Sequence, residues 1–439
     1  DYPAYMGAEL NPVINSDSEN GGGYKKNKSD RTSIQTSLNW DIPFLKGLSA
    51  KFMYNYSRYN ALYKGWNPAY TLYTYKDEQY IPKTYMSPST LVQDVHWATT
   101  NGLQLSVNYK RQFGQHTIDV LGLFEQSQNR TEYQGAQRYY TFDLDELAAG
   151  NNDKTQVIGA SFPDIIRRQG YVGRLNYNFA ERYLLELAFR YDGSSMYTGS
   201  GQFGLFPGGS VGWRLSEEKF LKEKLGFLDN LKIRASYGES GQDAGDPFQY
   251  VSGYNLNVGI YEFNDGTTTS GISAPSITNT NLTWYKAKLL DIGFDLSIFK
   301  GLFSLEFDLY QRKRSGLLAT RVVALPNTFG SQLPQENLNS DLTRGIDITL
   351  GHTNKIRNFS YSVKANMNLA RTRMEHVERG PFTSSMDRWR NQSSGRWNDF
   401  TWGYQTNGQF QTTEEIKYAP VQDGELGNSK ELPGDYRYV

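Results

Sequence analysis

The sequence predicts an all-β fold, a transmembrane antiparallel up-and-down β-barrel of which this chain supplies about twelve strands. Two patterns predict it. Apolar and polar residues alternate over segments of about ten residues, and the connections between these segments alternate between short and long. A third observation is the composition, with 14% aromatic residues and 32 Tyr against 23 Phe. Because the Tyr ring has an apolar body and a polar tip, it suits a sheet that meets both lipid and water.

The alternation places successive side chains on opposite faces of each predicted strand. It is clearest from Phe359 to Leu369, where apolar and aromatic side chains interleave with Ser, Lys and Asn. One face of this strand is therefore apolar and the other polar. The same pattern predicts the remaining strands, in chain order, at residues 34–40, 48–56, 103–109, 117–125, 171–179, 183–191, 206–215, 231–237, 290–298, 303–309 and 346–350.

The connections between the predicted strands differ systematically in length. Short connections are predicted at residues 41–47, 111–115, 180–182, 299–301 and 351–358, and a moderate, helical one at 216–230. Long connections are predicted at residues 60–102, 126–169, 192–205, 239–286, 312–342 and 370–400. Because alternate connections of an up-and-down sheet lie at the same end, all the long ones share one end. Outer-membrane barrels have this arrangement, with short periplasmic turns and long extracellular loops.

A soluble β-sandwich or propeller also has amphipathic strands, and three observations count against it. The alternation continues over about ten residues, which exceeds the usual strand length of about five to six in globular proteins. Aromatic residues lie near predicted strand ends, at Trp40, Tyr59, Tyr109 and Tyr191, as in the aromatic girdles of membrane barrels. No motif repeats at the period of propeller blades. No stretch reaches the roughly 18 to 20 consecutive apolar residues of a membrane-spanning helix.

The overall composition excludes several classes of function. The 439 residues include 46 basic and 46 acidic side chains, so the formal net charge is zero, and a nucleic-acid partner is not expected. The absence of Cys excludes disulfides, thiolate metal sites, iron–sulfur clusters and a cysteine nucleophile. A length prior of about 150 residues per domain would give three soluble domains, but β-barrels often exceed this size as one unit.

Short motifs indicate no catalytic residues, no metal site and no cofactor. The GxGxxG match at residues 199–204 lies between two predicted strands, whereas dinucleotide binding requires a strand–helix turn. The sequence contains no recognisable set of nucleophile, base and orienting group, so we do not expect an enzyme. The four His residues are widely separated, at His96, His116, His352 and His376.

Ionisable residues that interrupt the pattern also have structural interpretations. Asp143, Asp145 and Glu146 could bind a hard cation, but they lack the spacing of a calcium loop, and an ordinary solvated loop is the better interpretation. Charged residues of both signs lie on the polar faces of the predicted strands. These would pair with one another or with water inside a barrel. They are Lys51, Arg174, Glu186, Lys232, Arg234, Asp291, Glu306, Asp308 and Lys364.

The predicted loop at residues 60–102 is the segment that most suggests ligand binding. Flat aromatic faces next to polar groups suit sugar rings or peptide side chains. Packing of the same rings against the barrel rim or a partner protein is an equally good alternative. The candidate ligand-binding residues are Tyr63, Trp66, Tyr70, Tyr73, Tyr75, Tyr80, Tyr85 and Trp97.

Several blocks resemble, in order, the signatures of the SusC or RagA type of TonB-dependent outer-membrane transporters of Bacteroidetes. The first is YVGRLNY at residues 171–177, followed by RYLL and RYDGSS at 182–185 and 190–195. The next two are FPGGSVGWRLS and LKIRASYG, at 206–216 and 231–238. Similar blocks follow at residues 281–284, 403–410 and 433–438, so the resemblance spans about residues 170–439.

The resemblance implies a 22-stranded barrel in the outer membrane, plugged by an N-terminal domain and covered by a SusD-like lipoprotein lid. We expect residues 1–439 to be part of that barrel, with the plug, the segment that contacts the TonB–ExbB–ExbD complex and the closing strands outside this chain. The implied function is energy-dependent import of an oligosaccharide or peptide ligand. The alternative is a structural barrel that serves as a docking platform in a larger outer-membrane assembly.

Overall fold

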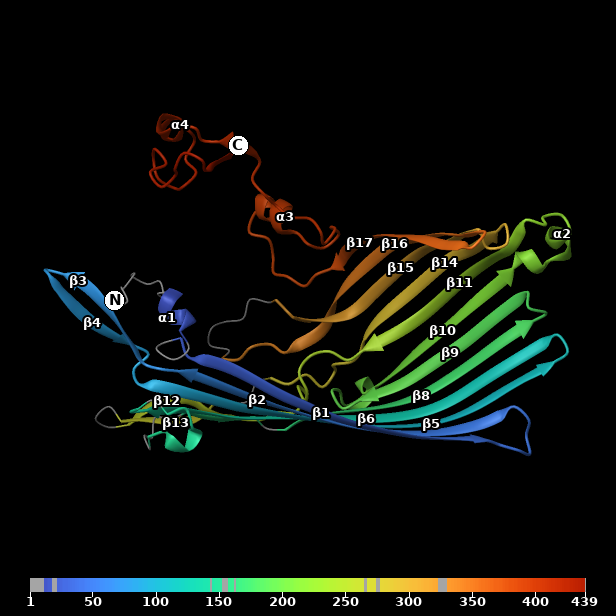
Figure 1. Cartoon of the computed structure of the whole chain (residues 1–439), viewed down its shortest axis with the longest axis horizontal. Coiled ribbons are helices and arrows are strands. Elements are labelled where there is room, and N and C mark those ends of the chain that lie inside the picture. Colours follow the sequence, from blue (N-terminus) through green and yellow to red (C-terminus); the bar gives the residue numbers. More distant parts are fainter. Residues whose placement is uncertain are drawn as a thin grey trace.

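One antiparallel sheet contains most of the strands in the computed structural model (Figure 1). The structure describes residues 12–17, 22–142, 144–151, 157–161, 163–263, 267–273, 277–322 and 330–438. The sheet has 13 strands, and twelve of them form a path in the order β1-β2-β5-β6-β8-β9-β10-β11-β14-β15-β16-β17, with β7 paired to β6. Neighbours on this path are in chain order, so the prediction of about twelve up-and-down strands is confirmed.

The twelve strands of the path cover every predicted segment, except that residue 215 begins a 3-10 turn. Their bounds are β1 (Tyr24–Asp41), β2 (Leu48–Asn67), β5 (Ser89–Phe113), β6 (His116–Tyr140), β8 (Asp164–Phe179), β9 (Tyr183–Ser194), β10 (Phe203–Arg214), β11 (Leu228–Gln242), β14 (Tyr285–Ile298), β15 (Phe303–Thr320), β16 (Gln335–Ile356) and β17 (Phe359–His376). The short strand β7 is Val157–Ala160.

Smaller elements occupy the connections and the end of the chain. They are the hairpins β3 (Tyr70–Lys76) with β4 (Gln79–Tyr85), β12 (Asn255–Phe263) with β13 (Thr267–Ser273), and β18 (Thr406–Gln409) with β19 (Tyr436–Tyr438). The helices are α1 (Pro12–Ser16), α2 (Lys219–Lys222), α3 (Ser385–Asn391) and α4 (Thr413–Tyr418), with 3-10 turns at Leu147–Ala149, Gly199–Gly201 and Leu215–Glu217. The predicted helical connection at 216–230 is thereby confirmed.

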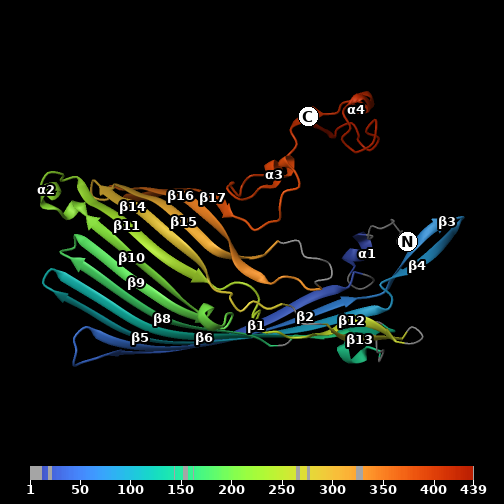
Figure 2. The same ribbon diagram turned by 180° about the vertical axis from the view of Figure 1, so that it is seen from behind.

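The sheet is curved, with one polar and one apolar face. Figures 1 and 2 show it bending from β1 to β17 as an open trough. One hollow is lined by residues of seven strands, from Lys110 of β5 to Asp291 of β14, which places the polar side chains on the concave face. On the convex face, Leu187 and Phe189 of β9 are 49% and 47% exposed. A large exposed apolar surface of this kind is typical of contact with lipid.

The two ends of the sheet differ. The short turns and α2 lie at one end, and β3, β4, β12 and β13 lie at the other (Figure 1). Aromatic side chains line the short-turn end of the convex face, where Phe179 and Trp213 both stack on Tyr183. This arrangement agrees with a girdle at a membrane interface. Within the described ranges, no helix is both long and apolar enough to cross a membrane.

The prediction that residues 60–102 form a loop is wrong. Strand β2 continues to Asn67, β5 begins at Ser89, and the hairpin of β3 and β4 lies between them. The pairing of β2 with β5 continues without a register shift to Asn67 opposite Thr90, and it places Tyr63 opposite Asp94. Neither face of this extension is uniformly apolar, as expected for a segment without one lipid-facing side, although the ladder of β2 with β5 persists.

Candidate functional site

A charged cluster on the concave face joins three neighbouring strands. The guanidinium of Arg234 on β11 donates hydrogen bonds to Asp308 on β15 at 2.7 Å, to Asp295 on β14 at 3.1 Å and to Asp291 on β14 at 3.3 Å. Lys232 adds an ion pair with Asp295 at 3.7 Å. These side chains keep between about a fifth and a third of their surface exposed. The predicted pairing of mixed charges on the polar face is confirmed for this group.

A glycine makes room for this cluster. A Cβ atom at Gly293 of β14 would lie 2.6 Å from the carbonyl oxygen of Phe307 and 3.1 Å from Cζ of Arg234, and closer still to the Asp308 carboxylate. The first distance is shorter than any ordinary contact of a Cβ atom. Gly293 therefore allows the Arg234 side chain to cross β14 and reach β15.

A second charged cluster lies nearer the long-connection end of the same face. Arg190 on β9 pairs with Glu125 on β6 and, at 3.0 Å, with its own strand neighbour Asp192. Gln104 on β5 donates to Glu125 at 3.1 Å. The cluster thereby links β5, β6 and β9 through side chains that lie on one face, as their registers require.

A third contact connects this face to the segment that follows β11. The guanidinium of Arg168 on β8 donates two hydrogen bonds to Asp243, at 2.8 and 3.1 Å. The Ser194 hydroxyl at the end of β9 donates to the same carboxylate at 2.8 Å. A bidentate pair of this kind is geometrically specific, so it fixes the position of the chain after β11 across β9 and β10.

The concave face is hollowed next to the cluster around Arg234, which forms part of the lining. A hollow of about 400 Å³ is lined by side chains from β5 to β14. Its ionisable lining residues include Lys110, Asp119, Glu186, Lys232, Arg234 and Asp291. Both signs of charge meet there, so the surface can form hydrogen bonds with a polar solute or a polar protein segment. No group of three or more His, Asp or Glu side chains suited to a metal occurs in the part of the chain that the structure describes.

The eight predicted aromatic ligand-binding residues do not form one surface. Trp66 is buried and packs edge-to-face on Tyr140, with ring centroids 5.1 Å apart. Tyr70 is buried and stacks on Tyr85 at 5.7 Å, in a small core with Ile14 and Leu72. Trp66 thus packs in a core with Leu91 and Tyr140 at the end of the main sheet, and Tyr70 and Tyr85 pack within the β3–β4 hairpin. Ligand binding by these residues stays a prediction.

The other predicted aromatic residues are more accessible but lie apart. Tyr75 and Tyr80 are 63% and 54% exposed near the tip of the β3–β4 hairpin, with centroids 5.0 Å apart. Tyr73 lies on β3, and its backbone is opposite Pro82. Tyr63 on β2 and Trp97 on β5 lie on opposite faces, because Tyr63 is paired with Asp94 and strand residues alternate.

The acidic residues Asp145 and Glu146 lie next to a basic side chain and a tyrosine hydroxyl. Asp145 accepts a hydrogen bond from the Tyr24 hydroxyl, and Lys64 lies 3.5 Å from both Asp145 and Glu146. Asp143 lies outside the described residues. The Tyr24 hydrogen bond and then the Lys64 charge hold the pKa of Asp145 below its ordinary value. This contact ties the start of β1 to the segment after β6.

Acid should release this contact only below the ordinary titration range of an aspartate. Because the pKa of Asp145 is lowered by folding, its stabilising contribution is present at neutral pH and is lost as the pH falls through the lowered pKa. Hydrogen exchange at residues 24–28 and 144–149, corrected for the intrinsic rate, should be equal at about pH 7 and pH 5 and rise only below about pH 3.9. Asp145→Asn should give fast exchange at every pH. A rise in the unmodified protein already at pH 5 would contradict the contact.

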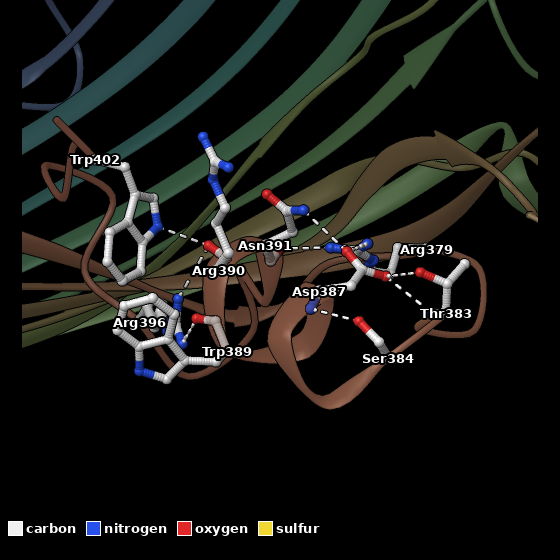
Figure 3. A network of polar contacts seen from close by, with 9 residues as sticks. All are labelled: Arg379, Thr383, Ser384, Asp387, Trp389, Arg390, Asn391, Arg396 and Trp402. Carbon is white, nitrogen blue, oxygen red and sulfur yellow. Dashed lines mark hydrogen bonds and ion pairs between the residues drawn. The ribbon is translucent and has the colours of Figure 1, made fainter. Parts of the chain in front are cut away.

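A polar network around α3 was missed in the sequence analysis (Figure 3). The Ser384 hydroxyl caps α3 by accepting from the backbone N–H of Asp387 at 3.0 Å. The Asp387 carboxylate accepts from Asn391 and from the backbone N–H of Thr383, both at 2.9 Å, and Arg379 lies 3.5 Å away. The signal was present as Ser-x-x-Asp at residues 384–387, a helix-start pattern inside a predicted loop.

Comparisons with known proteins agree with this architecture. The model of the family described as "TonB dependent receptor-like, beta-barrel" matches residues 2–435. "TonB-dependent receptor P26" of Formosa agariphila is 30% identical over 290 residues, which cover 65% of this chain and 28% of that protein. "TonB-dependent receptor SusC" of Bacteroides thetaiotaomicron is 30% identical over 246 residues, which cover 56% of this chain and 24% of that protein. The matches thus span about a quarter of each relative.

Solved structures have the same fold. The RagAB peptide importer in its "closed-closed" state superposes with a TM-score of 0.69 at 17% identity, covering 94% of this chain and 44% of that chain. The structure of the RagAB peptide transporter gives a TM-score of 0.65 at 18% identity, covering 81% of this chain and 38% of that chain. At this level of identity the likeness establishes the fold.

Proposed function

Because the chain belongs to the TonB-dependent receptor-like β-barrel family and is an outer-membrane protein, we propose that it serves TonB-dependent import of a nutrient. The single observation that supports import is the concave face. It carries paired charges and a hollow, whereas the convex face presents exposed apolar side chains such as Leu105 and Ile292. A polar interior inside an apolar exterior suits the passage of a polar solute through lipid.

We infer that further strands complete this sheet to a closed barrel. Strands β1 and β17 are the two ends of the described path, so each has one ladder edge without a partner strand along most of its length. Unpaired backbone groups cost several kcal/mol each in lipid. Closing strands would pair with these groups, and a plug domain would pack against the charged concave face. The implied barrel has 22 strands.

The proposed partners are a SusD-like surface lipoprotein, which would cover the long-connection end, and the TonB–ExbB–ExbD complex, which would supply energy. The similarity to SusC and to the RagAB importer supports both. The ligand would be an oligosaccharide or an oligopeptide. Of the predicted aromatic residues, Tyr75 and Tyr80 extend from the sheet on the β3–β4 hairpin (Figure 1), where they can contact the lid or a captured ligand. The import itself breaks no covalent bond.

Uptake measurements in cells test the proposal. Deleting the gene should abolish accumulation of a labelled oligosaccharide or oligopeptide, and loss of TonB should abolish accumulation while leaving surface binding intact. Restoring the gene provides the control. If the deletion strain accumulates every tested ligand at the normal rate, the import proposal is wrong. Loss of a larger outer-membrane complex with normal uptake would instead indicate a docking platform.

A further inference from the structure

A cluster of exposed aromatic rings and arginines follows β17. The rings are Trp389, Trp397, Phe400 and Trp402, which are 56%, 39%, 52% and 37% exposed. The arginines Arg388, Arg390 and Arg396 lie among them in the sequence. We name these seven residues the Trp/Arg cluster. Figure 1 shows α3, which carries the first of them, beyond β17 at the end of the sheet opposite the short turns.

Hydrogen bonds to the end of α3 fix the rings in place. The indole N–H of Trp402 donates to the carbonyl oxygen of Arg390 at 2.6 Å, and Arg396 donates to the same oxygen at 3.3 Å (Figure 3). The ring centroids of Trp389 and Trp402 are 4.2 Å apart, and Phe400 packs edge-to-face on Trp402 at 4.9 Å. The exposed aromatic surface is therefore held rigid before any ligand binds, which lowers the entropic cost of binding.

The cluster carries unneutralised positive charge. Neighbouring arginines outside it are paired, Arg371 with Asp399 at 3.0 Å and Arg379 with Asp387 at 3.5 Å. In contrast, among the described residues no carboxylate forms an ion pair with Arg388, Arg390 or Arg396. Figure 3 shows the Arg390 side chain extending away from α3 without a contact to the other residues drawn. The chain as a whole has zero net charge, so the positive charge here is a local excess. This local excess favours binding of an anion.

The backbone next to the rings is already paired. Met374 of β17 donates to the carbonyl oxygen of Arg396 at 2.8 Å, and Asn398 donates to that of Thr372 at 2.9 Å. The bridge between Arg373 and Trp397 lies between these bonds. A peptide ligand would commonly add to a free strand edge, and this part of the β17 edge is occupied. The guanidinium of Arg371 lies over the Trp397 ring at 4.5 Å, and that of Arg396 lies over Phe400 and Trp402. The exposed surface of Trp389 and the side chains of Arg388 and Arg390 remain available for recognition.

We propose that the Trp/Arg cluster binds an anionic oligosaccharide, with sugar faces stacked on the exposed rings and acidic groups paired with Arg388 and Arg390. Trp rings bury the apolar face of a sugar while its hydroxyl groups keep their hydrogen bonds. Guanidinium groups bind carboxylate and sulfate with two parallel hydrogen bonds. The proposed function makes the end of the sheet that carries this cluster the extracellular end, and the inference rests on that function. It narrows the ligand of that function to sugars with carboxylate or sulfate groups.

Calorimetric titration of the purified full-length protein tests this assignment. The probes are oligogalacturonate, a sulfated oligosaccharide, a cello-oligosaccharide of matched length and an oligoglutamate peptide. Binding of one or both acidic sugars is expected, and the two probes distinguish carboxylate from sulfate recognition. Trp389→Ala and Arg390→Gln should each weaken it about tenfold, which corresponds to about 1.4 kcal/mol. Trp389→Phe and Arg390→Lys should restore part of the loss, and added salt should weaken binding further.

Matched controls come from the opposite end of the sheet. Phe44→Ala removes an 81% exposed ring from the first short turn, and Arg357→Gln removes a charge from the last, and neither should change binding. Equal affinity for the neutral sugar, preference for oligoglutamate, absence of binding by either acidic sugar, or insensitivity to both cluster variants would overturn the proposal. If the protein binds the acidic sugar but does not support its TonB-dependent uptake, the proposed import function is wrong and the proposed binding site is supported.

Discussion

Replacing Leu105 with arginine should lower the free energy of unfolding by about 2 to 4 kcal/mol. Leu105 is 44% exposed on the convex face of β5, between Phe52 of β2 and Phe124 of β6. It lies four positions before Tyr109, about 13 Å along the strand from the aromatic girdle. A charge at this depth must leave water for hydrocarbon. Urea unfolding of the full-length protein in phospholipid vesicles, followed by tryptophan fluorescence, measures the loss.

The adjacent residue provides the control. Gln104 faces the opposite way and donates a hydrogen bond to Glu125 at 3.1 Å, so an arginine at this position can pair with that carboxylate. Gln104→Arg should therefore change the unfolding free energy by less than about 1 kcal/mol. Equal losses in both variants would show that the convex face does not contact lipid, and would contradict the membrane orientation.

The strands in contact with lipid could be predicted because the two faces of each strand have different surroundings. In β17, Phe359, Tyr361 and Val363 lie on the convex face, and Lys364 and the asparagines that follow lie on the concave face. A strand that has an apolar side chain on one face and a polar side chain on the other shows period-two alternation in its sequence. Short turns were equally predictable, since they interrupt the alternation for only a few residues.

The extension of the sheet could not be predicted by the same method. In β2 and β5, Lys64 pairs with Gln93 and Gly65 with Val92, so no face is uniformly apolar. Backbone hydrogen bonds hold these residues in strands, and because such bonds do not require particular side chains, the sequence pattern does not reveal them. Tertiary packing also buries Trp66, one of the rings that suggested a ligand-binding loop, and the sequence does not show this burial.

The sequence predicts which charged residues lie on the polar face, but it does not predict which of them form ion pairs with one another. Residues Arg234 and Asp308 are 74 positions apart, and their contact depends on the registers of two ladders and on Gly293 between them. A shift of either register by one residue would turn one of them to the lipid face. Sequence alternation places both on the polar face but does not say which charges meet.

Replacing Arg234 with glutamine should destabilise the sheet by about 2 to 3 kcal/mol. Breaking a fully buried ion pair costs about 3 to 5 kcal/mol, and the partial exposure of Arg234 at 29%, Asp291 at 21% and Asp308 at 19% reduces this value. The variant leaves the carboxylates of β14 and β15 close together without their shared cation. The same urea titration measures the loss, and raising the salt concentration should recover part of it by screening the repulsion.

A second substitution separates this repulsion from the loss of packing. Asp308→Asn combined with Arg234→Gln should be more stable than Arg234→Gln alone, because the double variant has one fewer uncompensated charge. Arg174→Gln is the matched control. Arg174 of β8 lies on the concave face, as Arg234 does. Among the described residues it forms no ion pair, so its loss should cost less than about 1 kcal/mol. If Arg174→Gln costs as much as Arg234→Gln, or if the double variant shows no recovery, Arg234 does not act as the shared cation of three carboxylates.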